Sequence, residues 1–170
     1  MNPFAQIITE YANLIPAAVA FAGLSGLVIA GVGLRMISVA KLTHQPSTKG
    51  YWAVMSGAIL VNVALWLSGF SQTFIATSAP STLVYASAGT GANSFVPFAL
   101  DTVQIFGWFG FIRGAMNLKN EAGEIGHGGK LIPIGQMVFG SLAANPVVML
   151  HAIGNTIGGQ LQSFINSVIQ

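Results

Sequence analysis

Long apolar segments alternate with short polar stretches along the chain. Four of these segments are each long enough to cross about 30 Å of hydrocarbon, which takes roughly 20 helical residues. They lie at about residues 15–40, 51–76, 98–118 and 131–153. Polar bends at residues 42–50 and 119–130, which contain proline or glycine, end the first and third segments. The pattern predicts an all-α membrane protein whose four hydrophobic helices form two tandem helical hairpins.

The remaining stretches complete a single helical membrane domain over residues 1–170. Asn2-Pro3 is a favourable helix start, and apolar residues then recur at helical spacing as far as Ile15, which predicts an amphipathic N-terminal helix. The tail that follows Asn155 has the same spacing and predicts an amphipathic C-terminal helix. Residues 77–97 are small and uncharged, and we expect an exposed loop there.

Composition supports the membrane class and excludes several others. The chain is 53% hydrophobic and 6% charged, whereas a soluble domain carries about 25% charged residues. The absence of cysteine excludes disulfides, thiolate chemistry and soft metal sites. A net charge of +2 is too small for a nucleic-acid face, so we expect no sequence-specific nucleic-acid binding.

The basic residues define the topology. All six lie in two stretches that contain the polar bends, residues 35–49 and 113–130: Arg35, Lys41, Lys49, Arg113, Lys119 and Lys130. Because basic loops stay on the cytoplasmic side of a membrane, both bends are predicted to face the cytoplasm. The N-terminus, the loop at 77–97 and the C-terminus are then predicted to face outward.

The two hairpins share short sequence patterns, which predict an internal repeat over residues 15–76 and 98–155. Arg35 and Lys41 are spaced as Arg113 and Lys119 are. The second segment contains Gly-x4-Asn (57–62), and the fourth contains the same pattern (140–145). An even number of spans per unit makes the two copies parallel. The alternative is chance, because small and apolar residues dominate both halves.

Two sets of residues are candidates for structural roles within the membrane. Glycines let helices approach closely, and those expected at helix contacts are Gly23, Gly26, Gly31, Gly107, Gly110 and Gly114. Three polar residues within the spans, Asn62, Asp101 and Asn145, are expected to be buried and to need hydrogen-bond partners.

The sequence gives no positive sign of an enzyme. It has no phosphate-binding glycine motif, no G-x-S-x-G and no HExxH. His44, His127 and His151 are scattered without metal-site spacing. Asp101 and Arg113 are about 18 Å apart along one helix and cannot pair there. We therefore expect no catalytic residue, no metal and no cofactor.

Two stretches resemble one family. GWFGFIRGAMNLK (107–119) and GSLAANPVVMLHAIGNTIG (140–158) are similar to small polytopic membrane proteins of type IVB secretion, the IcmC/DotE group and the TraQ proteins of I-type conjugative plasmids. The resemblance covers about residues 20–160. It implies a subunit of a bacterial inner-membrane machine that transfers DNA or protein, with other secretion or conjugation subunits as partners. It assigns no catalytic residue.

Each half of the chain also resembles the pilins of other conjugative systems, which are two apolar helices joined by a short basic bend. This resemblance implies a structural subunit that packs against copies of itself, either within the membrane or as an extracellular pilus. The six basic residues would then hold phospholipid headgroups, because phosphate attracts Lys and Arg. Two alternatives stay open: a small channel or transporter component with Asn62, Asp101, Gln104 and Asn145 along its path, and a holin-like pore former.

Overall fold

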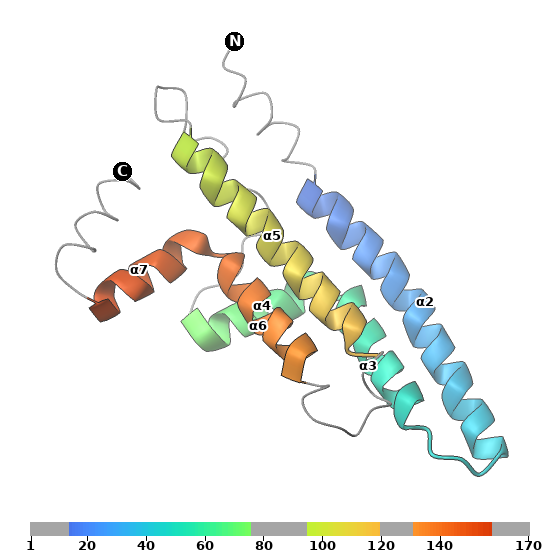
Figure 1. Ribbon diagram of the computed structural model, residues 1–170. Coiled ribbons are helices and arrows are strands. Elements are labelled where there is room, and N and C mark those ends of the chain that lie inside the picture. The colour runs from blue at the N-terminus through green and yellow to red at the C-terminus, as the bar shows by residue number, and fades with distance from the viewer. Residues whose placement is uncertain (1–13, 76–94, 120–130, 158–170) are drawn as a thin grey trace.

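The computed structural model describes residues 14–75, 95–119 and 131–157, and every regular element within these residues is a helix (Figure 1). The helices are α2 (Leu14–Leu42), α3 (Thr48–Val61), α4 (Val63–Ile75), α5 (Phe95–Asn117), α6 (Leu131–Ala143) and α7 (Pro146–Ile157). The predicted all-α class is confirmed. The two amphipathic terminal helices, the outward loop and most of the second basic bend were predicted for parts of the chain that lie outside the described residues.

One helix, α2, is long and apolar enough to cross a membrane by itself. It has 29 residues, and most of its apolar surface faces away from the rest of the chain. Its end is set by local backbone chemistry. His44 adopts a left-handed φ of 52°, and the Gln45 N–H donates to the Ala40 carbonyl at 3.0 Å. This is the hydrogen bond of a Schellman cap, and Pro46 follows it, so the helix stops before the bend.

Four continuous hydrophobic helices are not confirmed. The predicted second span is divided into α3 and α4, which meet at 90°, and the predicted fourth span is divided into α6 and α7, which meet at 89°. Counting each bent pair as one span gives three candidate spans in the described part of the chain. α5, with 23 residues, is not among these candidate spans, and it carries Asp101, Gln104 and Arg113.

The two bends have different local causes. Pro146 has no backbone N–H to continue α6, and the preceding Asn145 N–H turns to the Leu142 carbonyl instead. At the first bend there is no proline. The backbone of Asn62 leaves the helical region of φ and ψ, with φ −115° and ψ 40°. Its N–H still donates to the Ala58 carbonyl, at 3.4 Å.

α2 and α3 form the first hairpin, and their closest approach is made by glycines. A Cβ on Gly26 would lie 2.7 Å from the Gly57 carbonyl oxygen, and a Cβ on Gly33 would lie 2.9 Å from that of Gly50. Gly26 and Gly33 are seven residues apart, as are Gly50 and Gly57, so one antiparallel register satisfies both pairs. This spacing brings successive contacts back to the same helix face after about two turns.

α5 and α6 form the second hairpin with the same register. Gly107 lies opposite Gly140, where a Cβ on either residue would be 2.8 Å from the carbonyl oxygen of the other. Seven residues on, a Cβ on Gly114 would be 2.7 Å from the Pro133 carbonyl oxygen. Gly107 and Gly114 thus occupy the places that Gly26 and Gly33 occupy 81 residues earlier.

The hairpins lie side by side with the same orientation (Figure 1). The bend between α2 and α3, the end of α5 and the start of α6 lie toward one end of the molecule. α4 and α7 both project to one side, and the Asn145 amide donates to the Ser71 hydroxyl between them at 2.6 Å. The core between the hairpins contains Leu60, Leu67, Trp108, Phe111 and Ala115, all at most 1% exposed.

Candidate functional site

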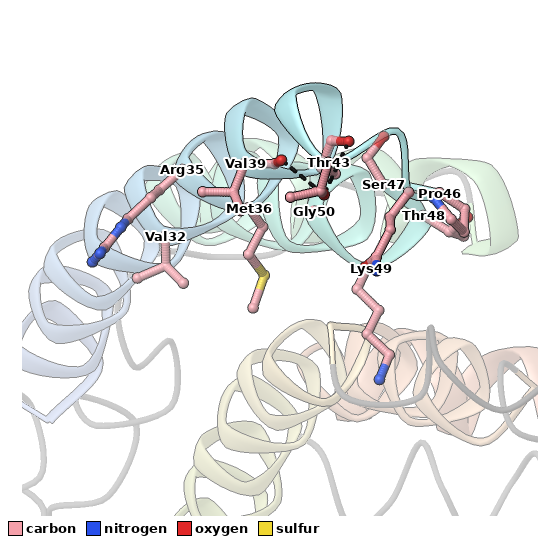
Figure 2. A pocket seen from close by; sticks show the side chains of 12 residues that line it. Val32, Arg35, Met36, Val39, Thr43, Pro46, Ser47, Thr48, Lys49 and Gly50 are labelled. Carbon is pink, nitrogen blue, oxygen red and sulfur yellow. Dashed lines mark hydrogen bonds between the residues drawn. The ribbon is translucent and has the colours of Figure 1, made fainter.

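A groove lies at the bend of the first hairpin (Figure 2). It has a volume of about 750 Å³ and is formed by the last turns of α2, the connection at 43–47 and the first turn of α3. Gly33 lies opposite Gly50, so Arg35 on α2 is level with the start of α3, which carries Lys49. Both cations line the groove and are exposed.

The groove combines charge with an apolar wall. Val32, Met36 and Val39 supply apolar side chains from α2, and the connection adds small polar groups. One of these, the Thr43 hydroxyl, donates to the Val39 carbonyl at 3.0 Å, as Figure 2 shows. A site with two cations at a helix end and an apolar wall below them can hold an anionic head attached to an apolar chain.

The other four basic residues are placed elsewhere. Lys41 is exposed at the end of α2 but does not line the groove. Arg113 is exposed on the second hairpin, and Lys119 is half-buried just after α5. Lys130 lies outside the described residues. Arg35 and Lys49 thus line one groove with their side chains pointing apart (Figure 2), and the structure does not gather all six cations into one described site.

The repeat of Arg35 and Lys41 in Arg113 and Lys119 does not follow the glycine register. Arg113 lies one residue before Gly114, whereas the residue before the equivalent Gly33 is Val32. The two arginines are therefore offset by three residues, about one helical turn. The pattern at residues 57–62 and 140–145 does follow the register, and both copies end at a helix break.

Three of the six glycines predicted at helix contacts lie in tight ones: Gly26, Gly107 and Gly114. Gly23 and Gly110 have their nearest neighbours at 4.0 and 3.7 Å, which is ordinary packing. The expectation for Gly31 is wrong within the chain, because nothing lies within 4 Å of a Cβ built there. Gly31 is five residues from Gly26, so it lies about 140° around the helix from the contact face.

Two of the three predicted buried polar residues are buried. Asp101 is fully buried on α5 beside the equally buried Gln104, and Asn145 is 4% exposed and bonded to Ser71. The expectation for Asn62 is wrong, since this side chain is exposed at the α3–α4 bend. The bend turns it outward, where a continuous helix would have kept it within the predicted span.

A second groove, of about 380 Å³, runs between α5 and α6 on the exposed side of the second hairpin. Phe106 and Phe139 form its edges and are 70% and 71% exposed. Gly107, Gly110 and Gly140 form its floor, and Arg113 and Gln136 add polar groups. Gln136 accepts a hydrogen bond from the Asn117 amide at 3.2 Å, which ties the two helices together.

Sequence reasoning missed several residues that hold the helices together. Gly50, Gly57 and Gly140 complete the glycine contacts, and the seven-residue interval between Gly50 and Gly57, which matches that between Gly26 and Gly33, was an available signal. It also missed Ser56, which is buried and donates to the Ala115 carbonyl between the hairpins. Nothing in the local sequence distinguishes this serine from the others.

In the described ranges no group of three His, Asp or Glu side chains could hold a metal ion. The described residues form three features: a basic groove at a helix end, glycine contacts within the two hairpins, and a second groove on the outside of the second hairpin. Comparison of the chain with protein-family models, with curated proteins and with solved structures gives no match in any of the three.

Proposed function

We propose that this chain is a structural, non-enzymatic subunit of a membrane assembly that holds phospholipid. On the resemblance described above, the assembly is a bacterial type IV secretion or conjugation apparatus of the IVB kind, in the inner membrane or as a conjugative pilus. Its partners are copies of itself, phospholipid and other subunits of the apparatus.

The basic groove of the first hairpin carries the proposal. Arg35 and Lys49 lie at the end of α2, a helix long enough to span the bilayer, so they are at the depth of lipid headgroups. Val32 lies on the interior side of Arg35, whereas Met36 and Val39 lie between Arg35 and the bend, so apolar side chains line the groove on both sides of this cation. A phospholipid fits such a groove, with its phosphate at one of the cations and its apolar part against Val32, Met36 and Val39.

The repeated hairpin supports a structural role. Both halves use the same antiparallel glycine register, and both turn by nearly the same angle at an equivalent asparagine. A duplicated two-helix unit, over residues 15–76 and 98–155, accounts for this agreement more simply than chance does. Because the bend of the first hairpin, the end of α5 and the start of α6 lie toward one end of the molecule, we propose that both units enter the membrane from the cytoplasmic side.

Reversing the groove's charge tests the proposal. We expect Arg35→Glu with Lys49→Glu to lower bound phospholipid about tenfold, since two charge-assisted contacts to phosphate become repulsive. The assembly is expected to be lost with the lipid. Lys41→Glu is the matched control, because it makes the same change on an exposed lysine outside the groove. The measurement is phospholipid phosphorus per chain, with particle size, after extraction in mild detergent.

The control determines how each result is interpreted. Loss of lipid and assembly in the double variant alone supports the groove. Normal lipid content and normal assembly in the double variant contradict it. Equal losses in the double variant and in Lys41→Glu also contradict it, since they indicate a general effect of charge on the membrane surface.

A further inference from the structure

The two hairpins of this chain do not pack on each other through equivalent faces. The first hairpin contributes large residues such as Leu60 together with small residues of α2 and α3, which we call the small face: Ala22, Ala53 and Ser56, all buried, and the half-buried Ser25. The second contributes larger residues of α5, which we call the tryptophan face: Trp108, Ile112 and Ala115. The Ser56 hydroxyl, which donates to the Ala115 carbonyl, joins the two faces directly.

The glycine register locates the counterpart of each face in the other hairpin. Gly26 corresponds to Gly107, so the tryptophan face corresponds on α2 to Leu27, Gly31 and Leu34, which we call the leucine face. Leu27 and Leu34 are 61% and 57% exposed, and none of the described residues lies within 4 Å of a Cβ built on Gly31. The face that is buried in the second hairpin is therefore open in the first.

The small face has an open counterpart too. By the same register, the small face corresponds to four residues of the second hairpin: the half-buried Gln136, as the counterpart of Ala53, and three apolar residues that we call the phenylalanine face, Val103, Phe106 and Phe139. These three residues line the groove between α5 and α6, and all are exposed. Each hairpin thus uses one side for the other hairpin and leaves the opposite side uncovered.

We propose that a second copy of this chain occupies the groove, with the phenylalanine face of one copy packed on the leucine face of the next. This contact would repeat between copies the contact that the hairpins make within one copy. Because the two faces differ, the contact is head-to-tail and adds copies without a two-fold axis, as in a ring or a filament. The inference rests on the proposed function, since it specifies how the subunit associates with itself.

Gly31 leaves room in the leucine face, because it stands where Ile112 stands in the second hairpin. The other positions meet through larger side chains, since Phe139 and Leu34 stand where Ser56 and Ala115 stand in the contact within the chain.

The pairing predicts one contact between copies. Ser56 meets Ala115 within the chain, and their counterparts are Phe139 and Leu34. The chain has no native cysteine, so Leu34→Cys and Phe139→Cys can be made on differently tagged copies and oxidised together in membranes. A disulfide forms only between Cα atoms about 4.4–6.8 Å apart. We expect a cross-linked dimer when the two variants are mixed and none from either variant alone.

Phe109→Cys mixed with Leu34→Cys is the matched control. Phe109 is exposed at a similar depth to Phe139, because Gly107 lies opposite Gly140, but it does not line the groove. Cross-linking of this pair as efficient as that of the first would overturn the inference. Leu34→Cys or Phe139→Cys joining to itself would also overturn it, because this indicates a two-fold contact.

A further variant adds bulk and removes no contact within the chain. Gly31→Trp fills the leucine face at a position with open space around it, so the protomer should unfold at an unchanged temperature while assembly is lost. Retained assembly in Gly31→Trp overturns the inference. Copies that assemble without the 34–139 cross-link leave the proposed function standing and refute this contact. Wild-type copies that stay separate refute both.

Discussion

Single glycines control how closely the helices approach in each hairpin. Gly26 and Gly31 lie on the same helix, α2, but on different faces of it. A Cβ on Gly26 meets backbone atoms of Gly57 and Val61 within 2.8 Å, and one on Gly31 meets nothing. Backbone atoms cannot move aside as a side chain can, so the first position excludes alanine and the second does not.

This contrast gives a prediction at the residue scale. Gly26→Ala should lower the free energy of unfolding by about 1–3 kcal/mol, because it overpacks the contact between α2 and α3. Gly31→Ala should leave it unchanged or raise it by up to about 1 kcal/mol, because alanine favours the helix. Equilibrium unfolding of the protomer in mixed micelles measures both. Equal stability of the two variants would show that α2 and α3 are not held at this distance.

The sequence shows which residues can make close contacts, but not which of them do. Composition identified the glycines of α2 and α5, and three of the six make tight contacts. The direction in which a glycine points depends on where its partner helix lies, which is set by the tertiary fold. Gly26 and Gly33 are seven residues apart, and so are Gly50 and Gly57. Only the comparison of these two intervals, one from each helix, indicates which glycines face each other.

At the scale of elements, the two helix breaks decide the shape of the molecule. Length and hydropathy predicted continuous spans at 51–76 and 131–153, and the structure divides each into two helices at nearly a right angle. Pro146 indicated a kink in the later span, but no proline marks the break at Asn62. Hydropathy is insensitive to such a break because both halves stay apolar. α3, with 14 residues, reaches only about 21 Å and does not cross a bilayer by itself.

The equivalent asparagines at the breaks give a matched pair of variants. Asn145 is buried and donates to Ser71 at 2.6 Å, whereas Asn62 is exposed. Asn145→Ala should lower the free energy of unfolding by about 1–3 kcal/mol, since the buried Ser71 hydroxyl loses this partner. Asn62→Ala should change it by no more than about 0.5 kcal/mol. Thermal unfolding in detergent distinguishes them, and equal losses would mean that the contact between α4 and α7 contributes nothing.

At the scale of the whole molecule, the sequence predicted the fold class and the positions of the bends better than it predicted how the helices pack. The all-α class, the helix α2 and the pairing of helices into hairpins follow from apolar segments and polar bends. The face that each hairpin presents to the other does not follow from composition, because small and large apolar residues are equally compatible with a membrane helix. Ser56 and Trp108 acquire their roles only where the hairpins meet.

The most direct test of the proposed structural role is to observe the chain as it occurs in producing cells. Electron microscopy and mass spectrometry of material sheared from the cell surface and of membranes in mild detergent show its form and its bound lipid. We expect many copies in a ring or filament, each related to the next by the same rotation or translation, with phospholipid at the bends. Single copies without retained phospholipid in both fractions would contradict the proposal.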